Sequence, residues 1–112
     1  MFWLQYHVTN VFKGCIKEHD NVYRTGGEEF VVVLSKVNYE DALHKIETIR
    51  DKVETNIFYF KQIDLTLTIS AGCYHPDIIK VDDVNIILKL ADNALYRAKQ
   101  TGRNKVLPVL IQ

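Results

Sequence analysis

Two glycines and two carboxylates stand in sequence at Gly26-Gly27-Glu28-Glu29, with apolar residues on both sides. The apolar runs 22–23 and 30–34 predict a β-hairpin, because glycine adopts the positive φ of a tight turn at little cost. Successive side chains of a strand point to opposite faces, so Glu28 and Glu29 are expected on opposite sides. Backbone without side chains beside a hard oxygen ligand suits phosphate and Mg²⁺. The turn is therefore a candidate site for a phosphorylated ligand and its metal ion.

Two cations near the other end of the chain could complete such a site. Lys99 and Arg103 are four residues apart, so they share a helix face if the final helical turn continues through Gly102. Arginine offers a planar fork to phosphate and lysine a mobile point charge. The structural alternative is simple, because cations at a helix C-terminus are stabilised by the helix dipole without any ligand.

The apolar pattern indicates which elements must hold these residues in place. Helical spacing predicts an amphipathic helix over 3–18, a second helix over 39–55 capped by Asn38, and a third that begins at Asp82 or Asp83. We expect Gly102 to end the third helix in a left-handed conformation. The buried face of that helix is predicted to carry Val84, Ile87, Leu88, Ala91, Leu95 and Ala98.

The remaining segments predict β-structure. The hairpin strands are expected over 21–25 and 29–35, and strict alternation predicts a half-buried strand over 63–73. Residues 105–110 predict a short strand, which Pro108 would confine to a sheet edge. The order of elements indicates one domain over residues 1–112. We expect an α/β (α+β) fold, with a mainly antiparallel central sheet flanked by helices.

The composition of the 112 residues is that of an ordinary globular protein, with 47% hydrophobic residues and a net charge of zero. That balance offers no support for binding to nucleic acid or to a membrane surface. No apolar run approaches the roughly 20 residues of a membrane span, and no signal peptide is visible. Cys15 and Cys73 are isolated, which favours reduced thiols in a cytoplasmic protein.

Three segments together resemble the GGDEF family, the diguanylate cyclases. The Gly26–Phe30 stretch is the Gly-Gly-Glu-Glu-Phe variant of the family's motif, and 67–72 is similar to the strand before its last helix. The run 91–104 resembles that closing helix and the Gly-Arg-Asn after it. The resemblance covers nearly the whole chain and implies the nucleotide-cyclase-like fold of that family.

The resemblance also implies an activity and its residues. A diguanylate cyclase condenses two GTP molecules into cyclic di-GMP and pyrophosphate with Mg²⁺ (or Mn²⁺), and two GTP-loaded domains must face each other. Glu28 would be the catalytic metal ligand, with Glu29 at the edge of the site. The residues expected to bind substrate are Gly26, Gly27, Lys99 and Arg103.

The chain departs from the family pattern in two places. The family's opening strand, with its Asp-x-Asp-x-Phe-Lys, and its guanine-contacting segments do not occur here, so the chain matches the C-terminal portion of the domain. We therefore expect little or no activity from this chain alone, and a homodimer or higher oligomer formed through exposed strand edges. Lys17 and Asp20 occupy the family's product-inhibition site, where lysine replaces arginine, so inhibition by cyclic di-GMP is expected to be weak or absent.

Two alternatives to a cyclase stay open from the sequence. One is a non-catalytic module that binds GTP or cyclic di-GMP, or that pairs with a longer partner in a regulatory role. The other is an interaction scaffold without ligands. Nucleotide affinity without turnover would favour the first, and the absence of any nucleotide-dependent shift in melting temperature would favour the second.

Overall fold

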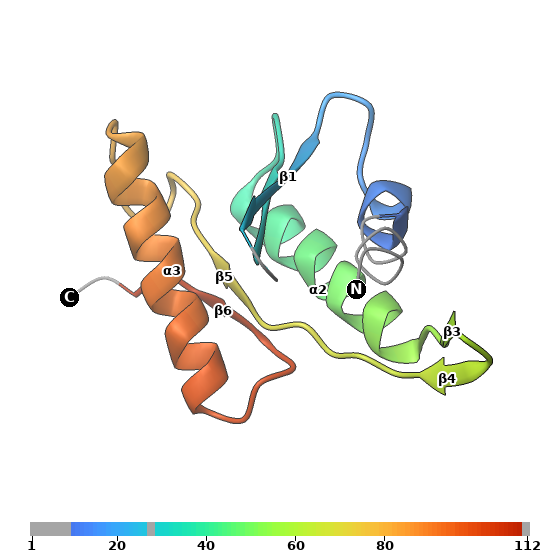
Figure 1. The fold of residues 1–112 in the computed structure, drawn as a ribbon. Helices are drawn as coiled ribbons and strands as arrows, with labels where there is room; N and C mark the ends of the chain where they lie inside the picture. The colour runs from blue at the N-terminus through green and yellow to red at the C-terminus, as the bar shows by residue number, and fades with distance from the viewer. Residues whose placement is uncertain (1–9, 27–28, 111–112) are drawn as a thin grey trace.

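The computed structural model describes residues 10–26 and 29–110, and Figure 1 shows their arrangement. Within these residues the elements are β1 (Asn21–Gly26), β2 (Glu29–Val33), α2 (Tyr39–Thr55), β3 (Phe58–Phe60), β4 (Ile63–Leu65), β5 (Ala71–Cys73), α3 (Val84–Gln100) and β6 (Val106–Pro108). The mixed helix and strand class predicted from the sequence is confirmed.

The described strands form three two-stranded sheets instead of one continuous sheet. The pairs β1–β2 and β3–β4 are antiparallel, whereas β5 and β6 are parallel. The short strand predicted after the last helix is confirmed as β6, and Pro108 lies at its end opposite Cys73. Because β2 and β5 each pair with a single described strand, one edge of each has no β-ladder partner in this part of the chain.

Helix α2 has the bounds that the sequence predicts, 39–55, and its N-terminus is capped as expected. The Asn38 side-chain oxygen accepts the Asp41 backbone N–H at 2.8 Å. Ile49 and Val53 from this helix form the core with Phe12 and Phe58. Phe12 also meets Phe30 of β2 edge to face, with ring centroids 5.1 Å apart. The core therefore joins the hairpin β1–β2 to α2 through side chains.

The helix predicted over 3–18 ends earlier than expected. Residues 10–15 are helical, 3–9 lie outside the described residues, and the chain turns after Cys15. The Asp20 side chain accepts the Lys17 backbone N–H at 3.0 Å, which gives that donor a partner outside the helix. This local hydrogen bond competes with another helical turn.

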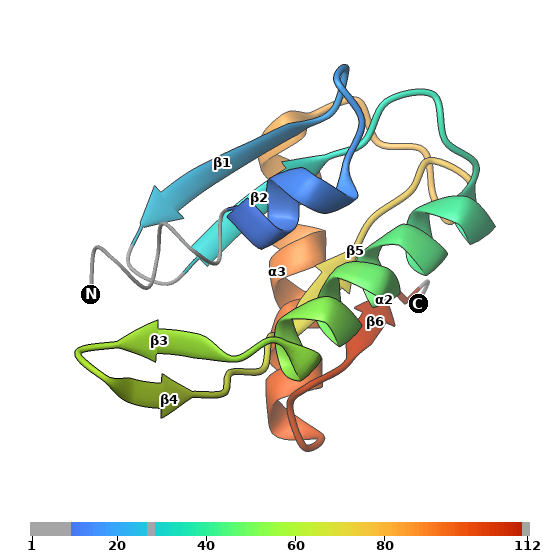
Figure 2. The same cartoon turned by 90° about the vertical axis from the view of Figure 1, so that its right-hand side faces the viewer.

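The single strand predicted over 63–73 is divided into β4 and β5. Residues 66–70 between them join no ladder, although Leu67 and Ile69 still pack against the core and Thr66 and Thr68 stay exposed. The apolar–polar alternation therefore predicts correctly which of these side chains face the core, but it wrongly predicts that residues 66–70 belong to a strand. Strand β3 was not predicted, and it folds back on β4 through a turn at Lys61 and Gln62, both with positive φ. Figure 2 shows this hairpin projecting beyond the end of α2.

Helix α3 begins where the sequence predicts, because the Asp83 carboxylate accepts the Asn85 backbone N–H at 2.8 Å. It packs closely on β5, where Gly72 permits the contact: an added Cβ would lie 2.6 Å from the Leu95 nitrogen and closer still to the Ala91 carbonyl oxygen. The expected burial of Val84 and Leu88 is wrong, since they are 65% and 43% exposed. Their spacing puts them on the same helix face as Ala91 and Leu95, but they lie in the first turns of α3, before the part of the helix that meets Gly72, and Ala94 is buried instead.

Candidate nucleotide site

Of the two predicted catalytic residues of the hairpin, Glu29 lies within the described residues. Gly26 pairs with Glu29 across the two strands, and Thr25 is an extra residue on β1, because Arg24 pairs with Phe30. Glu29 is exposed at the start of β2, whereas Phe30 turns toward the core. Gly27 and Glu28, the other predicted residues of this turn, lie outside the described residues.

The two predicted phosphate-binding cations lie at the C-terminal end of α3, but they are not on one helical turn. The helix ends at Gln100, and Gly102, Arg103 and Asn104 all have positive φ, at 116°, 62° and 48°. The helix does not continue through Gly102, so Lys99 and Arg103 do not share a helix face. Gly102 does end the helix as predicted, and the Arg103 backbone N–H donates to the Ala98 carbonyl at 2.9 Å, as in a Schellman motif.

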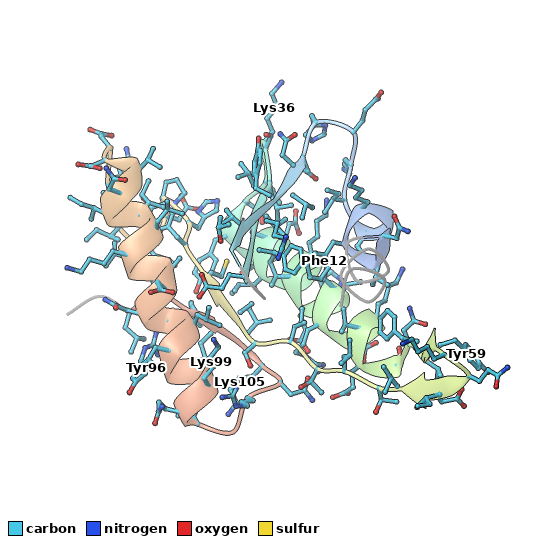
Figure 3. All side chains as sticks on the ribbon, in the orientation of Figure 1. Phe12, Lys36, Tyr59, Tyr96, Lys99 and Lys105 are labelled. Carbon is cyan, nitrogen blue, oxygen red and sulfur yellow. The ribbon has the colours of Figure 1, made fainter. Side chains whose placement is uncertain are left out.

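Both cations are available to a ligand. Lys99 and Arg103 are exposed, and within 10–26 and 29–110 neither side chain has a hydrogen bond or an ion pair. Figure 3 shows Lys99 beside the end of α3, near Lys105. The Lys105 ammonium donates to the Thr101 carbonyl, so that cation is held by the helix end. As far as the described part of the chain shows, the last turn of α3 and the loop after it thus present two positive charges to solvent without protein partners.

The hairpin and the end of α3 are not brought into contact. Among the described residues, neither β1 nor β2 approaches α3 closely. Figure 2 shows the turn end of the hairpin, where β1 ends and β2 begins, and the C-terminal end of α3 on separate parts of the molecule. Glu29 and the two cations therefore do not form one compact cluster within this part of the chain.

Asp20, predicted to belong to a degenerate inhibitory site, has a structural role. Its side chain is only 1% exposed, and it accepts the backbone N–H groups of Ser35 at 2.9 Å and Lys17 at 3.0 Å. Lys45 of α2 lies 3.5 Å from its second oxygen. Burial opposes ionisation of Asp20, but those two hydrogen bonds and the charge of Lys45 outweigh it and hold the pKa below its usual range.

The second member of that pair, Lys17, is exposed and lines an open hollow with Asp20. The hollow has a volume of about 400 Å³, and it lies between the end of the first helical segment and the start of β1. Its lining consists of Lys13, Ile16, Lys17, Glu18, Asp20, Asn21 and Val22. Two lysines face the hollow, but the Asp20 oxygens are already occupied by protein donors.

Asn104 is a residue whose importance the sequence did not reveal. Its side-chain oxygen accepts from Arg50 at 2.8 Å, its side-chain amide donates to Glu54, and its backbone N–H donates to the Ser70 hydroxyl at 3.1 Å. The only sequence signal was its place after Gly102-Arg103. That signal gave no indication of α2 as the partner, since 54 residues separate Arg50 from Asn104.

The described residues do not make a metal site by themselves. No group of three or more histidine, cysteine, aspartate or glutamate side chains gathers within 10–26 and 29–110. Both cysteines are free, as the sequence predicts, and burial raises the pKa of the Cys73 thiol. In the same residues no helix is both long and apolar enough to cross a membrane.

Comparison with known proteins decides the family. The model of the family described as "Diguanylate cyclase, GGDEF domain" matches residues 4–105. This chain belongs to the GGDEF family. Diguanylate cyclase A of Treponema denticola is 36% identical over 101 residues, which cover 88% of this chain and 26% of that protein. The chain therefore spans about a quarter of the length of this curated relative.

Solved structures support the same assignment. The active GGEEF domain of a diguanylate cyclase from Vibrio cholerae is 30% identical with a TM-score of 0.78, covering 96% of this chain and 67% of that one. The GGDEF domain of DgcB from Caulobacter crescentus, solved in complex with c-di-GMP, is 25% identical with a TM-score of 0.80, covering 92% of this chain and 61% of that one. The GGDEF fold predicted from the sequence is thus confirmed, and cyclic di-GMP synthesis with a divalent metal ion is the chemistry of the family.

Proposed function

We propose that residues 1–112 are the C-terminal portion of a single diguanylate cyclase domain, which condenses two GTP molecules into cyclic di-GMP and pyrophosphate. The observation that carries this proposal is the family match over 4–105, which includes the Gly-Gly-Glu-Glu-Phe motif, Lys99 in the last turn of α3 and Arg103 after it. Since the chain covers 67% of the Vibrio cholerae domain, the activity of the whole domain is carried over by inference. GTP is a cytoplasmic nucleotide, so the proposed location is the cytoplasm.

The proposed roles follow the chemistry of phosphate transfer, in which positioning and charge neutralisation supply most of the catalysis. Lys99 and Arg103 bind the triphosphate, and this role is supported by their exposure and by the absence of side-chain partners for them among the described residues. Gly26 and Gly27 let the substrate approach the backbone, and Glu29 lies at the edge of the site. Glu28 is the proposed ligand of Mg²⁺ or Mn²⁺. The described residues hold no complete metal site, so further ligands have to come from the substrate or from other protein groups.

The chain alone is expected to have little activity and to self-associate. The edges of β2 and β5 that lack a ladder partner in the described residues support this expectation, because open backbone edges pair readily with another strand. A second GTP-loaded domain is required in any case, since each GTP supplies one nucleotide of the product. The proposed assembly is a homodimer or higher oligomer, and sedimentation that stays monomeric at high concentration would contradict it.

A non-catalytic GTP- or cyclic di-GMP-binding, or dimerising, regulatory module is the second candidate. The hollow beside Lys17 favours it, because an exposed lysine there could contact an anionic ligand without any catalytic group. The Asp20 carboxylate cannot serve such a ligand freely, since Ser35 and Lys17 already donate to it. Product inhibition at this position is therefore expected to be weak in either case.

The test is incubation of the purified chain with GTP and Mg²⁺, with products identified by mass spectrometry and nucleotide affinity measured by calorimetry. Glu28→Ala and Lys99→Ala are the test variants, and Glu40→Ala, at an exposed carboxylate of α2, is the control. Slow cyclic di-GMP formation that Glu28→Ala abolishes would support a cyclase. Affinity without any turnover would favour the regulatory module, and the absence of both would overturn the proposal.

A further inference from the structure

The loop between α3 and β6 has an unusual backbone that needs an explanation. Gly102, Arg103 and Asn104 follow one another with positive φ. Glycine accepts this region freely and asparagine tolerates it, but an arginine there is uncommon. A residue held in this way persists only when the surrounding structure fixes it. Arg103 has no side-chain partner of its own among the described residues, so its conformation must be set by its neighbours.

The side chain of Asn104 supplies that constraint. It reaches α2, where its oxygen accepts from Arg50 and its amide group donates to Glu54. Its backbone N–H donates to Ser70, in the connection between β4 and β5. Asn104 thus links three separate segments through one residue. A side-chain hydrogen-bond network whose members are all satisfied makes the local structure more rigid.

Arg50, the donor to Asn104, is itself held in place by two carboxylates of its own helix. Its guanidinium is 2.6 Å from Glu47 and 3.5 Å from Glu54, and only 14% of its side chain is exposed. The hydrogen bond that Arg50 donates to the Glu47 carboxylate, above all, raises the pKa of Arg50. A charged, pre-oriented donor makes a stronger hydrogen bond than a mobile one. The anchor for Asn104 is therefore a fixed feature of α2.

The side chains of Arg103 and Asn104 are adjacent in sequence but lie in different environments. Asn104 is half-buried and engaged on the α2 side, whereas Arg103 is exposed and unpaired within the described residues. The backbone couples them, because the Asn104 N–H bond to Ser70 holds the peptide plane that follows Arg103 and so limits the ψ angle of Arg103. The Arg103 N–H bond to Ala98 adds a second fixed point on the other side.

We propose that Asn104 is a positioning residue, which holds Arg103 in its left-handed conformation and thereby directs the guanidinium toward a nucleotide phosphate. The inference rests on the proposed function, in which Arg103 contacts the triphosphate. It adds that α2, through Arg50 and Glu54, takes part in phosphate binding without touching the ligand.

The test combines amide hydrogen exchange with nucleotide affinity. Asn104→Ala is expected to speed exchange of the Arg103 amide. It should also raise the Kd for a non-hydrolysable GTP analogue with Mg²⁺ by about tenfold, as expected from loosening one charged phosphate contact. Asn104→Gly, which keeps the backbone freedom but removes the cross-link, is expected to behave like Asn104→Ala. Asn93→Ala, at an exposed asparagine of α3, is the control and should change neither quantity.

A double-mutant cycle separates positioning from a general structural role. In the Arg103→Ala background, Asn104→Ala is expected to weaken binding no further, because the group that it positions is gone. An equal loss in both backgrounds, full affinity in Asn104→Gly, or unchanged exchange at Arg103 would overturn the inference and leave the proposed function standing. No binding by the wild-type chain would overturn the proposed function, and this inference with it.

Discussion

The two regions that carry the proposed site are held in different ways. The unit of β5, α3 and β6 is cross-linked many times: Arg97 donates to the Pro108 carbonyl at 2.6 Å, Ala71 donates to Lys105 at 2.9 Å, and Asn104 reaches α2. Among the described residues, the attachments of the hairpin β1–β2 include the edge-to-face contact of Phe30 with Phe12 and, just after β2, the hydrogen bond from Ser35 to Asp20. The two cations proposed to bind phosphate thus lie beside a unit that hydrogen bonds join to segments distant in sequence.

This difference indicates how the geometry would be set in a site that is formed by both the hairpin turn and the end of α3. Lys99 and Arg103 would present a constant phosphate-binding surface, whereas the turn that bears Glu28 depends on how the hairpin is placed. Asp20 ties the end of the hairpin nearest Ser35, which is the end away from Gly26 and Glu29. The distance between the proposed metal ligand and the cations proposed to bind phosphate would then be set by packing of the hairpin, and changes in the two regions should have separable effects.

The largest effect is expected where α3 meets β5. Gly72→Ala forces a Cβ against the α3 backbone at Ala91 and Leu95, neither of which can move as a flexible side chain would. We expect a loss of about 4 kcal/mol or more in the free energy of unfolding, or failure to fold. Urea denaturation measures it. Gly14→Ala is the matched control, because no atom lies within 4 Å of its added Cβ, and it should be neutral or stabilising.

The next effect concerns the attachment of the hairpin. Asp20→Ala leaves two backbone N–H groups without their acceptor, and we expect a loss of about 2–3 kcal/mol. Asp92→Ala, at an exposed aspartate of α3, should change stability by less than about 0.5 kcal/mol. A similar loss in both variants would contradict the role given to Asp20. If the two regions are separable, the exchange rates of amides in α3 should change little in Asp20→Ala.

Asp20 also predicts a pH dependence. Because its pKa is lower in the folded chain than the ordinary value of about 3.9, its ionised form stabilises the fold. That contribution is complete above about pH 5 and is lost as the pH falls through the folded pKa. Thermal melts between neutral pH and pH 3 should therefore show a smaller acid loss in Asp20→Asn than in the wild type. An identical acid loss would show that other carboxylates account for it.

A smaller effect is expected at the end of α3. Gly102→Ala places a Cβ at φ 116°, which costs of the order of 1–2 kcal/mol, although the nearest atom, the Lys105 ammonium nitrogen, is 3.6 Å away. The cost is therefore conformational and not steric. Gln100→Ala, two residues earlier and exposed, is the control and should lie within about 0.5 kcal/mol of the wild type. Equal stability of the Gly102→Ala variant and the wild type would contradict the backbone argument.

The smallest effect is expected at the N-terminus of α2, which lies between the two regions. Asn38→Ala removes the acceptor of the Asp41 N–H and should cost about 1 kcal/mol, as for other N-cap residues. Asp83→Ala removes the corresponding cap of α3 and should cost a similar amount. A much larger loss in either variant would show that the cap has tertiary contacts beyond its own helix.

The elements that could be predicted from the sequence are those with local signals. Helix α2 and both N-caps follow from apolar spacing and from capping residues, which act within one turn. The division of residues 63–73 into β4 and β5, and the exposure of Val84 and Leu88, could not be predicted. Both depend on which other segments lie alongside, and periodicity reports only which face is apolar.

The sequence by itself determined the family, through the hairpin motif, the closing helix and the residues that would bind phosphate, because these are short motifs whose chemistry is carried by residue type and spacing. Only the tertiary structure decided that Asp20 is buried with its oxygens already occupied, and that Asn104 connects the last loop to α2. These features depend on contacts between residues distant in sequence, since a side chain's partner is set by where the packed elements bring it.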